Sequence, residues 1–374
     1  DDDSTQGAFF ELIALLYRRI WETGEIPQRL RSGLMLPMYK SPKDILSPRS
    51  WRPIVLFPFL AKVLHKLVIT RSHMMMGYTR DDATTTMNEQ YMDGWEAAAD
   101  TEHPTSKLHP AQYGSTPDRK GTLEPLLSYF LWADKARASG SGYTSVYDQA
   151  DAYTTVSHAR TLHGLYFDHG IRGQLWWLHH ELLHGVTLRI LLGARMTKEH
   201  EFEVGAAQGT GNAPFEWTVC FDGVPYHIQL SVPNALMLLY VDDLIAASRT
   251  AAGFQQLGRA VTSATDMGRT NLAPTKCKAM VVGATSSERA ALKADLARIG
   301  GYKVRGCDVA WNRVLLYLGC KFDHDGGMHT ERVVRGRGMR TGARLLAKAG
   351  VVAGNVRVKQ VLEHADGGPT AVMT

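Results

Sequence analysis

The chain has 374 residues, of which 44% are apolar and 21% are charged, proportions that are ordinary for a folded globular protein. This length is enough to bury a large core in two or three lobes. The net charge of +5 is compatible with a polyanionic partner but does not establish one. The cysteines include no Cys-x-x-Cys pair, which argues against a zinc ribbon and a disulfide scaffold: they are Cys220, Cys277, Cys307 and Cys320.

The first half of the chain is expected to combine helices with a few short strands. Its predicted elements, in chain order, are a helix over 9–21 closed by Gly24 and Pro27, a strand over 34–38, a polar loop over 41–50, a helix over 54–69, weakly patterned loops with short helices over 72–110, a helix over 121–136, a Gly-Ser connector over 139–142 and a strand over 143–147. The last of these strands runs directly into Asp148.

The second half is expected to continue with helices and hairpins. Its predicted elements are a mainly helical stretch over 162–183, a hairpin over 186–203, a helix from Ala213 towards Asp222, a hairpin over 235–247, a helix over 251–268, a strand over 279–282, a helix over 287–299 and a hairpin over 314–322. There is no internal repeat. Helices mixed with a few hairpins indicate an α+β fold.

The tetrapeptide Tyr240-Val241-Asp242-Asp243 places two adjacent carboxylates between two apolar runs. This pattern predicts two strands joined by a tight turn, with the acids at the tip of the hairpin. An Asp-Asp pair at a turn is usually only a solvated turn, but rigid strands would hold this pair where a cation can neutralise its repulsion. Two-metal phosphoryl transfer needs such oxygen ligands, because they hold hard divalent cations about 3.5–4 Å apart. The tetrapeptide therefore indicates a candidate polymerase.

A third carboxylate, Asp148, stands about 95 residues upstream, at the end of the strand predicted over 143–147. An aromatic residue, Tyr153, follows five positions later. In this order, the Asp148–Tyr153 segment and the Asp242-Asp243 turn strongly resemble the catalytic core of reverse transcriptases. Only the fold can bring such distant segments together.

Further blocks occur in the same order as in that family, and they resemble its non-LTR retrotransposon (LINE-type) branch. They are Gly24-Glu25-Ile26-Pro27, Leu36-Pro37-Met38-Tyr39-Lys40, Trp51-Arg52-Pro53-Ile54-Val55-Leu56, Leu60-Ala61-Lys62-Val63-Leu64, Gln112-Tyr113-Gly114, Gly205-Ala206-Ala207-Gln208-Gly209, Leu272-Ala273-Pro274-Thr275-Lys276-Cys277-Lys278 and Tyr317-Leu318-Gly319. The resemblance covers roughly residues 8–325.

The resemblance implies a right-hand polymerase fold of the α+β class. Residues 1–110 would form the fingers and an N-terminal extension, 111–325 a palm with an antiparallel sheet and a finger insertion, and 326–374 the start of a thumb with a basic C-terminal segment. It implies an RNA-directed DNA polymerase that uses two Mg²⁺ ions, or Mn²⁺, with an RNA template, a DNA primer and dNTPs as partners. Relatives of this branch copy element RNA onto a nicked chromosomal end, so a nuclear location is expected if the element is eukaryotic.

The resemblance also implies a role for each matched residue. Asp148 and Asp242 would hold the two cations, and Asp243 would be the weaker, supporting carboxylate. The nucleotide-binding residues would be Lys40 and Arg52 at the triphosphate, Tyr153 under the sugar, Gln208 and Gly209 over the template base, and Lys276 as a proton donor to pyrophosphate. Leu318 and Gly319 would belong to the hairpin that grips the primer. A Tyr under the sugar would leave no room for a 2′ hydroxyl.

Three positions depart from the family pattern. After Gln208-Gly209 the chain continues Thr210-Gly211-Asn212-Ala213-Pro214 in place of Ser-Pro with a further Pro, Thr154 replaces an Asp, and Ser115 replaces an aromatic residue. Two alternatives therefore stay open beside the active enzyme. One is a catalytically decayed remnant that binds nucleic acid, and the other is an RNA-dependent RNA polymerase, against which Tyr153 argues.

A rival motif, His180-Glu181-Leu182-Leu183-His184, matches the zinc-peptidase pattern of two His one helical turn apart with a Glu between them. A helix over these residues would allow the geometry, but no third ligand stands in a recognisable context downstream. In the polymerase interpretation this stretch is simply a helix after the Asp148 strand.

Residues 331–360 carry eight basic residues against one acid: Arg332, Arg335, Arg337, Arg340, Arg344, Lys348, Arg357 and Lys359. Such a run is typical of a segment that follows a phosphate backbone, and equally of a solvated helix face. No run of 18 uncharged apolar residues and no signal peptide is present, so we expect an intracellular protein without a membrane partner. The start Asp1-Asp2-Asp3 without a Met is consistent with a piece of a longer protein.

Overall fold

The protein is described by a computed structural model that covers residues 2–40, 44–78, 107–119, 121–283, 285–325 and 328–330. The basic segment predicted over 331–360 lies outside these described residues, as does most of the region 326–374 that was expected to begin a thumb. Within the described ranges, no helix is both long and apolar enough to cross a bilayer. The proposed domain boundaries stay predictions.

The first of the two main sheets has five strands. In spatial order they are β12 (Ala310–Trp311), β9 (Lys278–Val281), β3 (Tyr143–Tyr147), β8 (Asp243–Ser248) and β7 (Leu236–Tyr240). The central strand β3 is antiparallel to both β8 and β9, and β7 and β8 form the hairpin that carries the adjacent carboxylates. Three segments that are far apart in the sequence thus become neighbours in one sheet.

Side chains of this sheet alternate between two apolar cores, as the two-residue period of a strand requires. Tyr143 and Tyr147 of β3 pack with α8 (Ala213–Phe221), α9 (Gly223–Ser231), α10 (Ala251–Met267) and α11 (Ser286–Arg298). Val146 of β3 and Ile245 of β8 pack with α5 (Leu123–Ala138) and the hairpin of β13 (Val314–Tyr317) and β14 (Cys320–Asp323). Both faces are covered, so the central strands are rigidly held.

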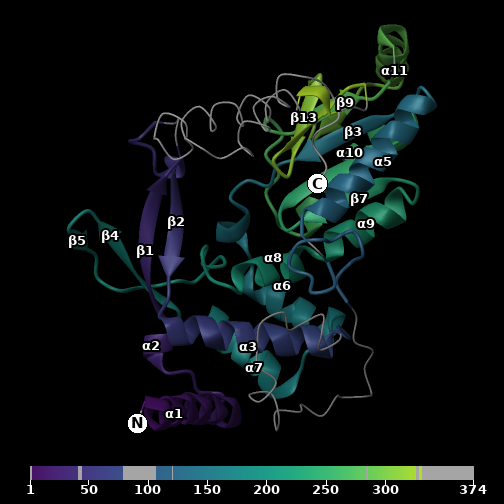
Figure 1. The fold of residues 1–374 in the computed structure, drawn as a ribbon. Coiled ribbons are helices and arrows are strands. Elements are labelled where there is room, and N and C mark those ends of the chain that lie inside the picture. The colour runs from purple at the N-terminus through teal and green to yellow at the C-terminus, as the bar shows by residue number, and fades with distance from the viewer. Residues whose placement is uncertain are drawn as a thin grey trace, which may run out of the picture.

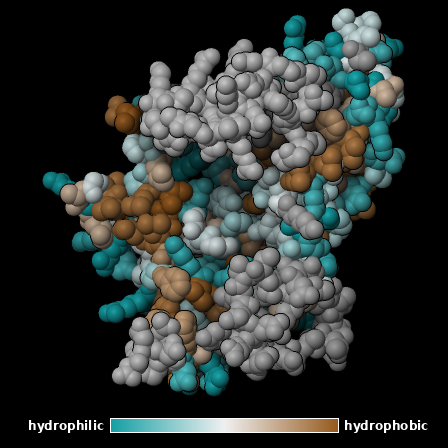
Figure 2. Space-filling view, viewed as in Figure 1, coloured by the Kyte–Doolittle hydropathy of each residue, from teal (hydrophilic) through white to brown (hydrophobic). Residues whose placement is uncertain are grey.

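The second sheet forms a ribbon away from the first (Figure 1). Its strands, in spatial order, are β2 (Trp51–Leu56), β1 (Ser32–Tyr39), β4 (Thr187–Leu192) and β5 (Arg195–Met196), and β6 (His200–Glu201) also pairs with β4. A separate small hairpin joins β10 (Lys303–Val304) to β11 (Cys307–Asp308). Figure 2 shows apolar side chains gathered over the ribbon, where Met38, Leu56, Leu192 and Met196 are exposed.

A third core lies where the base of the ribbon meets a group of helices (Figure 1). These helices are α1 (Asp2–Thr23), α2 (Gln28–Arg31), α3 (Phe59–Met75), α6 (His158–His163) and α7 (Gly173–Leu183), joined by residues from α8. Helices α6 and α8 lie between the two sheets, so the position of the ribbon relative to the carboxylate hairpin depends on this packing.

Most of the predicted elements are confirmed, and the mixture of helices and antiparallel strands is the expected α+β class. The strand predicted over 143–147 matches β3 residue for residue, and the helix predicted over 251–268 differs from α10 only at its last residue. The helix from Ala213 is followed directly by a second helix, α9, which extends the predicted element to Ser231.

The helix predicted over 54–69 is wrong at its start. Residues 54–56 belong to strand β2, and helix α3 begins only at Phe59. The cause is Pro58, which disfavours a helical conformation at the residue before it and serves as the N-cap of α3 with φ −52°. The stretch over 162–183, predicted to be mainly helical, is so, with a π-helical turn over Gly164–Asp168 and a break before α7 where Gly170 and Gly173 have positive φ.

Candidate active site

Three carboxylates meet at one end of the first sheet. In the β3–β8 pairing Tyr147 lies opposite Leu244, so Asp148 leaves β3 beside Asp243, the first residue of β8. In the β7–β8 hairpin Tyr240 pairs with Asp243, which leaves Val241 and Asp242 as the two-residue turn. The strand register therefore brings Asp148 to the Asp242-Asp243 pair across about 95 residues of sequence.

The proximity of these carboxylates is visible in their proton affinities. Partial burial of the Asp243 carboxyl group, together with the charges of Asp242 and Asp148, raises its pKa to about 6. Burial also raises the pKa of Asp242, with Asp148 adding to the effect and a hydrogen bond to its own backbone and the positive charge of Arg52 opposing it. Protons or cations are therefore favoured at this end of the sheet.

Lys276 supplies a positive charge directly at this cluster. Its Nζ lies 3.0 Å from Asp148 Oδ1. The segment that carries it runs beside the residues after β3, because Ala273 N–H donates to the Asp148 carbonyl at 2.9 Å and Ala150 N–H donates to the Asn271 carbonyl at 2.6 Å. In this structure Lys276 is thus an ion-pair partner of Asp148, and the predicted contact with pyrophosphate stays a prediction.

Tyr153 faces the same carboxylates from a short helical turn over Ala152–Thr155. Burial raises the pKa of its phenol to about 12, and the negative charges of Asp242 and Asp243 contribute. Its carbonyl accepts a hydrogen bond of 2.6 Å from Ala206 N–H, so the loop that precedes α8 holds this turn in place. The structure therefore brings Tyr153 to the carboxylates, while its contact with a sugar stays a prediction.

Gln208 and Gly209 lie against strand β2 of the ribbon. Val55 N–H of β2 donates to the Gln208 carbonyl at 2.6 Å. Gly209 has φ +108°, and a Cβ at this position would lie 2.8 Å from the Val55 carbonyl oxygen. The glycine is needed for this close approach of two backbones. The loop thus joins β2 to α8, and its contact with a template base stays a prediction.

Arg52 lies on strand β2 of the ribbon, and Lys40 directly follows its neighbour β1. Arg52 is exposed and close enough to lower the pKa of Asp242. Lys40 follows the last residue of β1, and its backbone N–H donates to the Ser50 carbonyl at 2.7 Å. The structure therefore associates Arg52 with the carboxylates, while the role of Lys40 at a triphosphate stays a prediction.

Leu318 and Gly319 form the two-residue turn between β13 and β14, with φ of +48° and +78°. The adjacent Tyr317 donates a hydrogen bond of 3.2 Å from its hydroxyl to the Leu238 carbonyl of β7. Burial raises the pKa of Tyr317, and the charge of Asp243 adds to the shift. The hairpin is thus attached beside the carboxylates, and its contact with a primer stays a prediction.

Two side chains form hydrogen bonds to the Val241-Asp242 turn, and the sequence alone assigns neither of them a role. The side-chain amide of Gln112 bonds to both backbone groups of Val241, and the Trp217 indole N–H donates to the Val241 carbonyl at 3.0 Å. The block Gln112-Tyr113-Gly114 was a signal for the family but not for this contact. The signal for Trp217 was only its place in an apolar helix.

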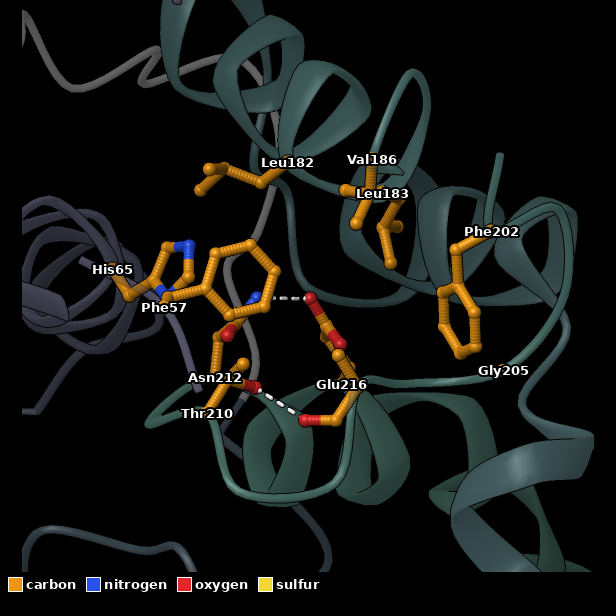
Figure 3. A pocket seen from close by; sticks show the side chains of 11 residues that line it. Phe57, His65, Leu182, Leu183, Val186, Phe202, Gly205, Thr210, Asn212 and Glu216 are labelled. Carbon is orange, nitrogen blue, oxygen red and sulfur yellow. Dashed lines mark hydrogen bonds between the residues drawn. The ribbon is translucent and has the colours of Figure 1, made fainter. Parts of the chain in front are cut away.

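A small cavity of about 20 Å³, roughly the size of one water molecule, is lined by the loop that contains Gly205, Thr210 and Asn212 and by residues of α3, α7 and α8 (Figure 3). Its polar lining includes His65, Asn212 and Glu216, and the Asn212 side-chain amide donates to Glu216. Burial raises the pKa of Glu216 to about 8 and lowers that of His65 to about 4. Both side chains are therefore neutral near pH 7, as buried groups without an opposite charge should be.

The zinc-peptidase alternative gains no support from the described residues. The rings of His180 and His184 stack with centroids 4.3 Å apart, and Arg31 Nη1 binds Glu181 Oε2 at 2.9 Å. In the described ranges no group of three His, Cys, Asp or Glu side chains is arranged to hold a metal ion. The same holds at the carboxylate cluster, where Lys276 is paired with Asp148.

Comparisons with known proteins show the family to which this chain is similar. A family model described as reverse transcriptase (RNA-dependent DNA polymerase) matches residues 40–322, about three quarters of the chain. Among solved structures, apo telomerase from Candida tropicalis, truncated from its C-terminal domain, is 9% identical with a TM-score of 0.48, over 80% of this chain and 54% of that chain. Telomerase from Candida tropicalis in complex with the TWJ fragment of telomeric RNA is 7% identical with a TM-score of 0.49, over 91% and 53%.

The chain spans about half the length of these telomerase chains. No curated protein sequence matches it.

Substitution of Gly209 by Ala should destabilise the protein. The positive φ and the backbone oxygen 2.8 Å from the new Cβ together should lower the free energy of unfolding by about 1–3 kcal/mol. Gly211 in the same loop is the matched control, because an added Cβ there would meet no atom within 4 Å and its φ is not positive. Urea unfolding of both variants checks this, and an equal loss in the two would contradict the proposed close approach.

Substitution of Glu216 by Gln should remove part of the pH dependence of stability. The folded-state pKa of about 8 lies above the unfolded value of about 4.3, so the folded protein retains a proton that the unfolded chain releases. This group therefore lowers the free energy of unfolding as pH rises from about 4.3 to about 8. In urea unfolding from pH 5 to 9, the free energy of unfolding of the variant should increase relative to that of the wild type as the pH rises. Parallel curves would contradict the buried, protonated state, and Glu22→Gln on the exposed side of α1 serves as control.

Proposed function

Because the chain belongs to the reverse transcriptase (RNA-dependent DNA polymerase) family, we propose that it copies an RNA template into DNA at the cluster of Asp148, Asp242 and Asp243. The observation that carries this proposal is the β3–β8 register, which places Asp148 beside the Asp242-Asp243 turn. The family match covers all three residues. The resulting group has the composition that nucleotidyl transfer requires, which is several carboxylates on rigid strands.

The residues fit a hard divalent cation in their chemistry. All three donors are carboxylate oxygens, and their mutual repulsion, together with burial, raises the pKa of Asp242 and Asp243. We propose that Asp148 and Asp242 hold Mg²⁺, or Mn²⁺ in its place, with Asp243 as the supporting ligand. Bound cations would supply charge stabilisation at the attacking and leaving oxygens. Lys276 would have to release Asp148 as the cations bind, because it already neutralises that carboxylate.

The surrounding side chains suit an incoming deoxynucleotide. Arg52 is near enough to Asp242 to affect its pKa, and a guanidinium presents a fork that matches phosphate oxygens. Tyr153 is near enough to Asp242 and Asp243 for their charges to raise its pKa, its turn is fixed by Ala206, and a rigid ring there would exclude a 2′ hydroxyl. Lys40 on the ribbon would add a second positive charge at the triphosphate, and Lys276 would be placed to give a proton to pyrophosphate.

The remaining assignments concern the template and the primer. Gln208 and Gly209 would contact the template base, and the turn of Leu318 and Gly319 would hold the DNA primer beside Asp243. The order of the sequence blocks supports an origin in a retrotransposon of the non-LTR type. The altered residues after Gln208-Gly209 keep the decayed remnant as the alternative, because this loop connects the ribbon to α8.

Primer extension tests the proposal directly. With an RNA template, an annealed DNA primer, dNTPs and Mg²⁺, the wild type should extend the primer, and Asp242→Asn should lower the rate by at least about 100-fold, because it removes one negative ligand. The matched control is Asp134→Asn, which changes an exposed acid on α5 that pairs with Arg137. It should extend at the wild-type rate.

Other outcomes separate the alternatives. Equal extension by wild type and Asp242→Asn would place the chemistry elsewhere and contradict the proposal. Binding of primer–template without extension by the wild type would favour the decayed remnant. Preferential use of ribonucleotides would favour an RNA polymerase and contradict the role of Tyr153.

A further inference from the structure

The turn that carries Asp242 is held by a side chain from a distant segment. Gln112 Oε1 accepts from Val241 N–H at 2.9 Å, and Gln112 Nε2 donates to the Val241 carbonyl at 3.3 Å. Trp217 of α8 donates its indole N–H to the same carbonyl at 3.0 Å. Both Gln112 and Trp217 are buried, so these bonds form away from water. We call the two side chains the Val241 clamp.

Val241 needs such a hold because of its backbone conformation. Its φ is +59°, in the left-handed region that β-branched residues rarely adopt. Such a conformation is strained for a β-branched residue and persists only where the surroundings impose it. The strained residue stands immediately before Asp242, so any relaxation of Val241 would redirect that carboxylate.

The orientation of the Gln112 amide is fixed by its neighbours. Its Oε1 also accepts from Gly114 N–H at 3.0 Å. Two N–H groups therefore point at Oε1, while the Val241 carbonyl accepts from Nε2. A Cβ on Gly114 would lie 2.6 Å from Val241 N. The glycine therefore allows the Gln112 segment to lie directly against the turn.

The segment that carries Gln112 is itself anchored at both ends. Tyr113 N–H donates to the Leu239 carbonyl of β7, and Leu239 N–H donates to the Ala111 carbonyl, each at 2.8 Å. Two residues before Ala111, His109 N–H donates to Asp222 Oδ1 at 2.8 Å. The clamp is thus attached to the edge of the sheet and to the junction of α8 and α9.

From this geometry we propose that Gln112, with Trp217, is a positioning residue for the polymerase reaction: it holds Val241 in its left-handed conformation and so fixes Asp242 for catalysis. This inference rests on the proposed function for its kinetic consequence. Neither side chain is required to touch substrate. Their effect passes through the Val241 peptide.

A double-mutant cycle tests the clamp. Gln112→Ala should lower kcat by about 10- to 100-fold with little change in the KM for dNTP, because the carboxylate is misplaced while the nucleotide contacts stay. Asn adopts the left-handed conformation far more readily than Val. In the Val241→Asn background, the same Gln112→Ala change should therefore lower kcat by less than about threefold. Equal losses in the two backgrounds would overturn the proposal.

Trp217→Phe and Gln255→Ala complete the set. Trp217→Phe keeps an aromatic ring but removes the N–H, and it should lower kcat in the same direction as Gln112→Ala. Gln255 is a matched control, since its amide also donates to two backbone carbonyls, those of Ile299 and Gly301, but in α10. Gln255→Ala should leave kcat unchanged, and a loss equal to that of Gln112→Ala would show a general effect on stability instead.

Hydrogen exchange at the Val241 amide tests the Val241 clamp by a measurement that does not require polymerase activity. In Gln112→Ala this amide loses its acceptor, so its exchange should quicken at least about tenfold relative to the Ile245 amide within the sheet. Unchanged exchange would overturn the clamp. If the wild type does not extend a primer, the proposed function fails on that result, while fast exchange in the variant still supports the hold on Val241.

Discussion

The fold has to hold three like-charged carboxylates at one end of a sheet. Their mutual repulsion and partial burial raise the pKa of Asp242 and Asp243. Ionisation of the three side chains therefore destabilises the folded arrangement that brings them together. The opposing force is the burial of β3 and β8 between two apolar cores, which makes the strand register costly to change. Lys276 relieves part of the repulsion at Asp148.

The loops around the carboxylates are also held in place by the rest of the fold. Each is fixed by a backbone hydrogen bond to another segment: the Tyr153 turn to Ala206, the Gln208 loop to Val55 of β2, and the Lys276 segment to Asp148 at the end of β3. The backbones that carry these side chains are therefore tied together, and the Lys276–Asp148 ion pair adds a side-chain contact within the cluster. This is the arrangement that accurate positioning at a charged site requires.

Much of the site could be predicted from sequence because its signals are local. The strand before Asp148 and the hairpin around Asp242 are apolar runs ended by polar residues, and the structure has them where they were expected. The helix predicted over 54–69 is wrong at its start because apolar spacing alone does not register the effect of Pro58. The hold of Gln112 on Val241 cannot be predicted from the sequence because it joins segments 129 positions apart. Only the folded backbone shows that Val241 needs it.

Manganese binding tests the central claim, that the β3–β8 register brings Asp148 and Asp242 together to hold cations. The measurement is a titration with Mn²⁺ followed by electron paramagnetic resonance at about pH 7.5, above the pKa of about 6 of Asp243. Asp148→Asn and Asp242→Asn should each weaken the tightest site by at least about tenfold, since each removes a charged ligand. The exposed-acid variant Asp134→Asn should bind as the wild type does. Wild-type affinity in either cluster variant would contradict the account.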